Sequence, residues 1–495
     1  MQNKLPDWKG RWPQWSDGYT ANVLDELQHQ GYDVGRLQWK APREFRSIVY
    51  NQSGFDALNR RAALDSTVIG IVSSRADQAS MTITEQLRDL VEWTEIEEGG
   101  YRHGDFELRV FDQLHLELDR VAEAFDDPEY VVVASKHSGD SGPLLSAHFT
   151  GNFEAADYGG APRSVSEPAP GALKHVLGEL DANAPAGYDV SMECTHHGPT
   201  DLGAPGLFVE LGSGPEQWAD SSGGRAIAEA ILALEGVPPW ADRTFVAFGG
   251  NHYAPQPTRV LLETDAAIGH VAADWSLDEL GDPAEHRDLI EALFEKSDAT
   301  AALFDGAHPA VRAVVESLGY EVVSETRVRE TSGVDPALVE ALTDRLGSIE
   351  SGLRFGDRRD PAPDVRSLPA DLLDACAAID PEVTVEAVAD HTVAYQTAEN
   401  GNRVGERAAF PDDSAFDDLI DSCLDVLREE YESVERTDGA VRAERDRFDP
   451  DLAAAAGVPE GPLFGQLAAG QSVTVDGETI EPDSVHRRET RRFDV

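Results

Sequence analysis

The sequence predicts an α/β protein, and three observations support this class. Apolar, β-branched segments of strand length alternate along much of the chain with longer segments of helical character. The strongest strand signal, residues 131–134, is apolar without interruption, as in a parallel sheet that is buried on both faces. This segment ends abruptly in small polar residues and histidines, and parallel sheets carry their chemistry just past the carboxyl ends of their strands.

The elements follow in order from residue 68, where the first apolar segment begins. Residues 226–234 are an Ala-rich helical segment that neither Gly nor Pro interrupts. Residues 283–296 and 309–318 each begin with Pro, which favours the first turn of a helix. Gly and Pro mark a loop at 155–170 and a linker at 356–363. Strands are expected at 68–72, 106–111, 130–134, 206–211, 244–248 and 320–323. Helices are expected at 81–93, 121–125, 173–183, 226–234, 283–296, 309–318, 336–349 and 414–431.

The composition predicts three parts. A chain of 495 residues is too long for one ordinary core. Residues 1–65 hold nine basic and eight acidic residues and four of the eight tryptophans, whereas the whole chain has a net charge of -51. We therefore expect an N-terminal extension at 1–65, a main domain at 66–330 and a C-terminal extension at 331–495. The N-terminal extension is either an RNA-binding module or an upstream segment without a selected role.

The acidic charge bears on environment and partners. The chain has only six lysines, and its acidic residues are spread over a sequence that is 41% hydrophobic, so we expect a folded protein with an acidic surface. This pattern is typical of a salt-rich cytoplasm, as in a halophilic archaeon; a chance acidic bias is the alternative. Acidity disfavours nucleic-acid partners, but at 1 M salt the Debye length is only ~3 Å and long-range repulsion is weak.

The cysteines and the apolar segments exclude several classes. Cys194, Cys376 and Cys423 are far apart and form no CxxC motif, so neither a disulfide framework nor a four-cysteine zinc site is expected. No signal peptide and no apolar segment of ~18 residues is present, which predicts a soluble, cytoplasmic protein without a membrane partner. No GxGxxG or Walker sequence accompanies the glycines, so no nucleotide cofactor is expected.

Histidines gather near the ends of the expected strands, and seven of the fourteen fall between residues 137 and 270. Five of the seven lie in four short motifs: Ser135-Lys136-His137-Ser138-Gly139, His148-Phe149-Thr150-Gly151-Asn152, Glu193-Cys194-Thr195-His196-His197-Gly198-Pro199, and Gly249-Gly250-Asn251-His252-Tyr253. A fifth motif, Glu210-Leu211-Gly212-Ser213 with Trp218, has no histidine. Recurring in this order, the motifs resemble the archaeal and plant type of D-aminoacyl-tRNA deacylase, from Val68 to about residue 330.

The resemblance implies a fold, a reaction and a cofactor. The fold is a three-layer phosphorylase/hydrolase-like domain similar to peptidyl-tRNA hydrolase, to which a smaller C-terminal α+β region is added. The reaction is hydrolysis of the ester that links a D-amino acid to the 3′-terminal ribose of tRNA, releasing free D-amino acid and tRNA. Zinc dependence with two ions per chain is implied, and we expect a monomer.

The same motifs supply the candidate site residues. A lone histidine is more often structural than functional, but packing alone rarely collects five imidazoles. The candidate metal ligands are His137, His148, Glu193, His196 and His197, and the candidate catalytic residues are Lys136, His137, Asn152, Glu193, His197 and His252. Because adjacent residues on an extended chain face opposite ways, we expect that His196 and His197 do not bind one ion together and that Glu193 shares a site with one of them.

Two single residues have competing interpretations. Lys136 stands in a central motif of a chain that has almost eliminated lysine, so a compact ammonium is expected to serve a phosphate, the terminal ribose or an oxyanion; otherwise it is a leftover lysine. Cys194 is either a thiol nucleophile with a neighbouring histidine as base or, as is more usual, a small buried residue.

Alternatives to the deacylase reading stay open at this point. Another tRNA- or nucleoside-directed hydrolase or phosphorylase could use the same fold, and a non-catalytic RNA-binding protein could keep the histidines for structure. In the C-terminal extension, the region near 448–485 resembles a segment of the tRNA 3′-processing endonuclease ribonuclease Z, without its His-x-His-x-Asp-His metal motif. That resemblance implies an RNA-end contact surface, and coincidence is the alternative.

Overall fold

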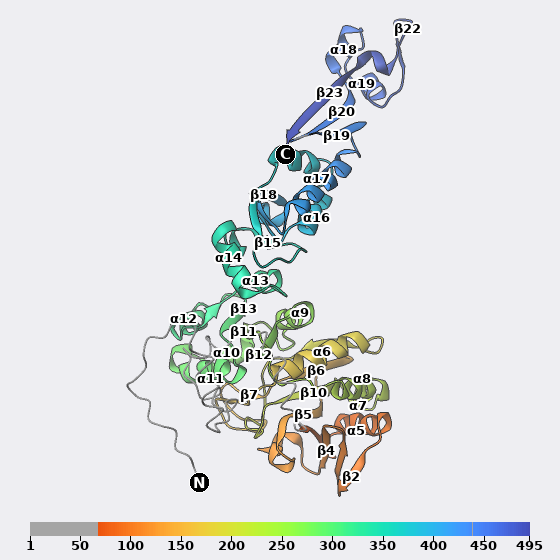
Figure 1. Ribbon diagram of the computed structural model, residues 1–495. Helices are drawn as coiled ribbons and strands as arrows, with labels where there is room; N and C mark the ends of the chain where they lie inside the picture. The colour runs from red at the N-terminus through yellow and green to blue at the C-terminus, as the bar shows by residue number, and fades with distance from the viewer. Residues whose placement is uncertain (1–67, 438) are drawn as a thin grey trace, which may run out of the picture. The chain divides into compact units, whose positions relative to one another are not determined.

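The computed structural model describes residues 68–437 and 439–495. The expected N-terminal extension at 1–65 lies outside the described residues. Helices and strands alternate from Val68 onward, and the largest sheet is mixed, which confirms the predicted α/β class (Figure 1). Among the described residues, no helix has the length and apolar character needed to cross a membrane.

The largest sheet has eight strands in the order β2-β3-β4-β1-β5-β10-β6-β9. Its central strands β4, β1, β5 and β10 are parallel, whereas β6 runs antiparallel to β10 and β9 runs parallel to β6. The bounds are β1 Val68–Ser74, β2 Thr94–Glu97, β3 Gly100–His103, β4 Phe106–Phe111, β5 Pro128–Lys136, β6 Leu144–His148, β9 Asp189–Met192 and β10 Gly206–Gly212.

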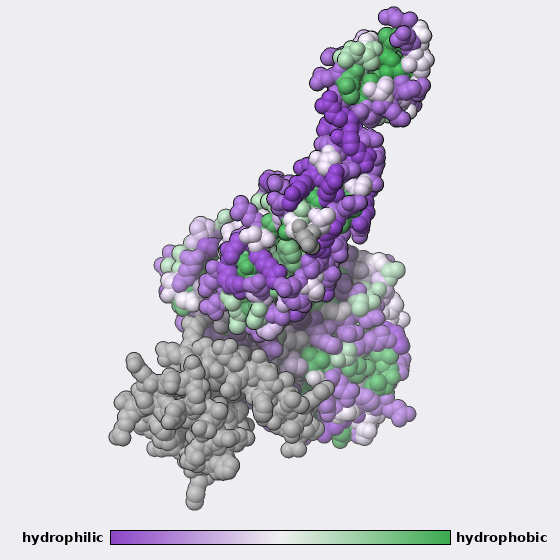
Figure 2. Space-filling view, turned by 45° about the horizontal axis from the view of Figure 1, so that its top comes forward, coloured by the Kyte–Doolittle hydropathy of each residue, from purple (hydrophilic) through white to green (hydrophobic). Residues whose placement is uncertain are grey.

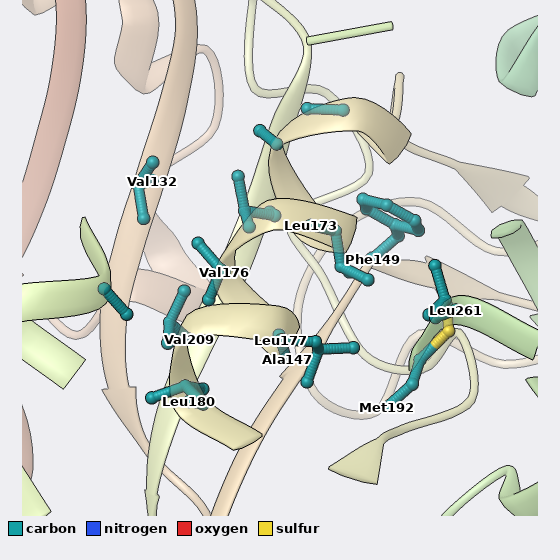
Figure 3. Packing of buried hydrophobic residues seen from close by; sticks show 14 of the residues in the cluster. Val132, Ala147, Phe149, Leu173, Val176, Leu177, Leu180, Met192, Val209 and Leu261 are labelled. Atoms are coloured by element: carbon teal, nitrogen blue, oxygen red, sulfur yellow. The ribbon is translucent and has the colours of Figure 1, made fainter. Parts of the chain in front are cut away.

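Both faces of β5 are covered, which explains its uninterrupted apolar sequence. Val132 and Ala134 pack with α5, α6 and α8 on one face, and Figure 3 shows the side chains of α6 within this cluster. Val131 and Val133 pack on the other face against η3 and neighbouring loops. The bounds of these and adjoining elements are α5 Gln78–Leu90, η2 His115–Glu117, η3 Val121–Ala124, β7 Gly151–Asn152, β8 Ser164–Val165, α6 Pro170–Asn183, α7 Pro215–Trp218 and α8 Ser221–Leu232.

A second sheet of four parallel strands has the order β12-β11-β13-β14. Its central strand β11 is buried throughout and leads into the segment that contains His252. The bounds are β11 Thr244–Gly249, α9 Pro255–Glu263, β12 Ala267–Ala272, α10 Asp274–Leu280, η4 Pro283–Glu285, α11 Arg287–Ser297, β13 Ala301–Asp305, α12 Pro309–Ser317, β14 Glu321–Val322 and α13 Glu325–Glu330.

The residues after α13 combine helices with antiparallel sheets. One sheet has the order β15-β17-β18-β16, a second has the order β19-β20-β23, and β21 and β22 form a hairpin. The bounds are α14 Pro336–Leu346, η5 Ile349–Ser351, β15 Leu353–Phe355, β16 Asp364–Ser367, α15 Ala370–Ala377, α16 Pro381–His391, β17 Ala394–Ala398, η6 Glu399–Gly401, β18 Arg403–Phe410, α17 Asp413–Leu427, β19 Ser433–Thr437, β20 Ala440–Phe448, α18 Pro450–Ala455, α19 Pro462–Ala468, β21 Val473–Val475, β22 Glu478–Ile480, η7 Pro482–Val485 and β23 His486–Asp494.

Several expected elements differ in detail. The helix expected at 283–296 is divided into η4 and α11, because Asp282 caps the first and the chain turns at His286 before the second begins. The helix expected at 121–125 is the 3-10 turn η3, and the loop expected at 155–170 contains the short strand β8. Helix α17 ends at Leu427, four residues earlier than the expected end at Tyr431.

The lysines that the structure describes occupy specific positions. The ammonium of Lys174, on α6, donates to the carbonyl oxygens of Leu261, Thr264 and Ala266 at 2.6, 2.6 and 2.9 Å, so it satisfies the end of α9 and joins it to α6. Lys296 donates to the carbonyl of Val165. An ammonium with three rotating donors suits such convergent carbonyls better than a planar guanidinium does.

We expect Lys174→Met to lower the free energy of unfolding by about 3 kcal/mol, because three partly buried carbonyls lose a charged donor. Urea unfolding in concentrated KCl measures the effect. Arg225→Met on α8 is the control, since Arg225 is an exposed cation paired with Glu229 and its loss should cost less than about 1 kcal/mol. Equal stability of the two variants would contradict the structural role of Lys174.

Candidate active site

A cluster of histidines and glutamates lies where the two sheets meet. We call it the histidine–glutamate cluster; it comprises His137, His148, Glu193, His196, His197, Glu210 and His252. The backbone N–H of Cys194 donates to the carbonyl of His252 at 2.8 Å, and that of Thr195 donates to the carbonyl of Val271 at 2.9 Å. These bonds fix the segment after β9 against the second sheet.

Three histidines of the cluster are oriented in the same way. The Nδ1 atoms of His148, His196 and His197 lie 3.1, 2.8 and 2.7 Å from the carbonyl oxygens of Phe149, Cys194 and Gly198. A neutral imidazole that donates from Nδ1 carries a free lone pair on Nε2, which is how metal-binding histidines are usually oriented. One ring nitrogen from each of the three lies within 4.8 Å of the others.

A second group has a carboxylate at its centre. Glu193 is fully buried, with its Oε2 2.6 Å from His252 Nε2 and its Oε1 3.0 Å from His137 Nδ1. His137, Glu193 and His252 also fall within 4.8 Å of one another, and they share no residue with the first group. These two sets of potential metal ligands share no residue, but a third possible set, Cys194, His196 and His252, overlaps both of them.

The buried carboxylates are held as anions. Although burial opposes ionisation, contacts with His137 and His252 hold the pKa of Glu193 well below its usual value, and His137 and His148 lower the pKa of Glu210. Burial also opposes the charged form of His137, but its contacts with these two glutamates raise its pKa to about 11.

The three oriented histidines differ in charge preference. Burial, followed by the positive charge of His148, lowers the pKa of His196 to about 3, and burial, followed by the charge of His196, also lowers the pKa of His197. For His148, contact with Glu210 outweighs burial and raises the pKa. His148 Nε2 is buried and lies 3.4 Å from Glu210 Oε1, too poorly aligned to form a full hydrogen bond. Two neutral imidazoles and one unsatisfied nitrogen beside buried anions form a site suited to a cation.

The expectation that His196 and His197 face apart is wrong. Their ring centroids are 4.5 Å apart, and both belong to the same group of potential ligands as His148. The alternation rule applies to extended chains, but His197 has a φ of 39°, in the left-handed region. The segment turns there and brings both rings to one side. Glu193 is also expected to share a site with one of these histidines, and its Oε2 lies 3.8 Å from His196 Nε2.

The cluster lies over a face of the largest sheet as well as at its edge. His137 directly follows β5, as expected for chemistry past a parallel strand. His148 instead ends β6, which is antiparallel to β10 and pairs His148 with Phe208 near the middle of β10. Because β6 is antiparallel, this imidazole lies over the face of the sheet, short of the carboxyl ends of β5 and β10. Its ring stacks on that of Phe208, with the centroids 5.3 Å apart.

Lys136 has surroundings different from those of His137. Ser135 and His137 point toward Glu210, so strand alternation directs Lys136 to the opposite face, where its Nζ lies 5.2 Å from the Trp218 ring centroid. The indole of Trp218 in turn donates to the carbonyl of His137 at 2.8 Å. Lys136 thus adjoins the segment that positions His137 without belonging to the cluster.

Asn152 holds a loop beside the cluster. Its amide donates to the carbonyls of Gly159 and Ala161 at 2.8 and 3.2 Å, and the N–H of Gly198 donates to the carbonyl of Tyr158 at 3.0 Å. The loop and the histidine segment are therefore joined. The side-chain amide of Asn152 therefore donates to backbone carbonyls of the loop and not to a residue of the cluster.

Cys194 has the surroundings of a structural thiol. It is fully buried, and burial raises its pKa to about 12, which disfavours the thiolate that a nucleophile requires. Its Sγ lies 3.6 Å from His252 Nδ1, so it can help to orient that ring.

Sequence reasoning did not assign Glu210 to the site. Glu210 accepts a hydrogen bond from Ser135 at 2.8 Å and lies within 3.5 Å of both His137 and His148. A detectable signal was present, because a glutamate within the apolar strand Gly-Leu-Phe-Val-Glu-Leu must be buried and therefore requires partners. Gly212 beside it is also required, since a Cβ there would lie 2.6 Å from the Cβ of His137.

Comparisons with known proteins agree with this geometry. The family model described as D-aminoacyl-tRNA deacylase matches residues 124–323, which include every member of the cluster. A D-aminoacyl-tRNA deacylase of Halobacterium salinarum is 50% identical over 435 residues, covering 86% of this chain and 95% of the relative. One of Natronomonas pharaonis is 48% identical over 443 residues, covering 86% of this chain and all of the relative.

More distant proteins extend the match. A D-aminoacyl-tRNA deacylase of Methanoregula boonei is 32% identical over 434 residues, covering 84% of this chain and 96% of the relative. The crystal structure of a conserved protein of unknown function, AF0625, matches 54% of this chain and 99% of its own, with 27% identity and a TM-score of 0.50. With near-complete coverage of relatives up to 50% identical, this chain belongs to the D-aminoacyl-tRNA deacylase family.

Proposed function

We propose that this chain hydrolyses the ester bond of D-aminoacyl-tRNA at the histidine–glutamate cluster, releasing free D-amino acid and tRNA. The observation that carries the proposal is the convergence of three Nδ1-anchored imidazoles beside two buried carboxylates, in a chain of this family. The preference for the D-amino acid rests on the names of the relatives. A cytoplasmic location is a prediction that follows from the tRNA substrate.

Zinc fits the residues present. Nitrogen ligands with second hydrogen bonds to backbone carbonyls are typical of zinc sites, and His148, His196 and His197 provide three of them. His137, Glu193 and His252 form a separate set, which supports the proposal of two ions per chain. Zinc bound at such sites supplies Lewis-acid polarisation of the ester and a lowered pKa of water.

The surrounding residues orient the ligands and the substrate. Glu210, which accepts a hydrogen bond from Ser135, contacts both His137 and His148, so these rings do not have to reorganise during the reaction. The side chain of His252 is 32% exposed, whereas Glu193 beside it is inaccessible. We infer that the ester approaches over His252 and that Glu193, which is hydrogen-bonded to its Nε2, fixes the orientation of this ring.

Two residues have proposed roles at the margin of the cluster. Lys136 is proposed to place its ammonium near a phosphate, the terminal ribose or the developing oxyanion, from its position over Trp218. Asn152 is proposed to act by fixing the loop that borders His197.

The likeness of this domain to peptidyl-tRNA hydrolase remains a proposal based on the motifs. The three-part division at about residues 65 and 330 is also proposed. Three antiparallel sheets of the described residues lie after α13, which supports a separate C-terminal part. The ribonuclease-Z-like segment near 448–485 spans α18, α19 and the hairpin of β21 and β22. A monomer is likewise a prediction.

Hydrolysis of D-Tyr-tRNA and L-Tyr-tRNA, measured side by side in concentrated KCl, tests the proposed function. We expect release of D-tyrosine only, loss of activity after chelation and recovery on adding zinc. Equal turnover of both substrates would contradict D-specificity. Full activity in chelated protein shown to be metal-free would contradict the proposed zinc dependence.

Replacing His148, His196 or His197 by Ala should lower zinc content and single-turnover rate together, because each replacement removes a ligand. Atomic emission beside single-turnover kinetics measures both quantities. His175→Ala is the matched control, since His175 lies on α6 and its nearest carboxylate is Glu179. Wild-type zinc content in all three variants would refute this metal site.

Lys136→Arg should retain zinc and lose turnover by about 10²-fold, the scale of losing one oxyanion donor. The reason is geometric, because a guanidinium is longer and planar and cannot occupy the same position over Trp218 as a compact ammonium. The same two measurements apply. A fully active Lys136→Arg variant would leave Lys136 a packing role only.

A further inference from the structure

Strands β20 and β23 concentrate positive charge in a strongly acidic chain. Their 18 residues contain seven arginines, although the chain as a whole has a net charge of -51. The two strands pair in antiparallel register over nine residues each. β23 is the outer strand of its sheet among the described residues.

The register places arginine directly opposite arginine at two positions. Arg442 is the partner of Arg492, and Arg447 is the partner of Arg487. Like charges directly opposite on neighbouring strands destabilise a sheet. Opposite charges would have been available, as they are for Arg445 with Glu489 and for Asp446 with Arg488. Arg442 also faces Glu435 on β19, and each of the four arginines has a carboxylate within 4.0 Å. These ion pairs offset part of the repulsion, but they do not require arginine opposite arginine.

The same arginines are exposed. Arg442, Arg447, Arg487 and Arg492 have side-chain exposures between 57% and 70%. Arg445 differs, because it is 24% exposed and is held by both Glu430 and Glu489.

Packing does not require these side chains. The burial of this sheet comes from Val441, Ala443 and Phe493, which join the apolar cluster of α15, α16 and α17. Arg491, also exposed, has no carboxylate within 4.0 Å among the described residues and lies over the Phe493 ring at 4.9 Å. We call Arg442, Arg447, Arg487, Arg491 and Arg492 the arginine ribbon.

We propose that the arginine ribbon binds the phosphodiester backbone of the tRNA substrate. This proposal rests on the proposed function, which supplies an RNA partner. Five residues separate Arg442 from Arg447, roughly 17 Å along a strand, and strand alternation places the Arg442–Arg492 pair and the Arg447–Arg487 pair on opposite faces of the sheet. The outer strand β23 therefore offers guanidinium groups on both faces, and the two pairs can contact different phosphates of an RNA backbone that passes around this edge. Guanidinium groups bind phosphate oxygens in bidentate geometry, a short-range contact that survives when salt screens longer-range attraction.

Two double variants of the full chain test this proposal: Arg442→Gln with Arg492→Gln, and Arg447→Gln with Arg487→Gln. Each should raise the Kd for uncharged tRNA by about 10-fold and raise KM for D-Tyr-tRNA similarly. The plot of log affinity against log KCl concentration should become less steep by about 1.5 in each, because two phosphate contacts are lost. Turnover of D-tyrosyl-adenosine, which lacks the tRNA body, should not change.

The matched control replaces Arg403 and Arg428 by Gln. Both are about half exposed, have one carboxylate partner each and belong to the same part of the chain. We expect the control to keep wild-type affinity and the ribbon variants to keep the wild-type melting temperature, since they relieve like-charge opposition. Unchanged tRNA affinity in the ribbon variants, or an equal loss in the control, would overturn the proposal. Absence of hydrolysis by wild-type protein would instead count against the proposed function.

Discussion

The organisation of this protein depends on the burial of two carboxylates, Glu193 and Glu210. An isolated buried carboxylate costs many kcal/mol, so each must be ionised next to compensating positive charge or hydrogen-bond donors. His137 contacts both glutamates, and His148 and His252 contact one each. The surrounding imidazoles are thus needed to compensate the charge of the two carboxylates, whatever the reaction. The same arrangement also presents nitrogen and oxygen atoms to a cation.

The fold meets this requirement by bringing separate strands to one place. Glu210 comes from the middle of a parallel strand, His148 from an antiparallel neighbour and His252 from the second sheet. Backbone bonds between Cys194 and His252 and between Thr195 and Val271 join the sheets beside the cluster. Buried His270 reinforces this contact, because its ring lies 3.0 Å from both Thr195 Oγ1 and the Ser166 carbonyl. Burial lowers the pKa of His270 to about 3, so it serves as a neutral structural link.

How far the sequence predicts this structure depends on whether the signal is local. The apolar sequence of β5 identifies a central buried strand, and the histidine motifs identify the residues that meet at the site. The direction of β6 is not a local property, so the position of His148 below the strand ends could not be derived. The convergence of His196 and His197 depends on one left-handed residue that no propensity signals. The face occupied by Lys136 depends on where β5 ends relative to its neighbours, which only the paired strands define.

The distribution of cations follows from the acidity of the chain. The view in Figure 2 is dominated by hydrophilic residues, and a surface of this charge repels RNA unless salt screens it. In concentrated salt, the charges that still matter are those in direct contact or shielded from solvent. Lys174 donates directly to three carbonyls, and Glu193 and Glu210 are buried, so both kinds of interaction remain effective. The proposed RNA contact of the arginine ribbon would depend on direct guanidinium–phosphate contacts of this kind, and the same screening weakens the repulsion between opposed arginines on a sheet.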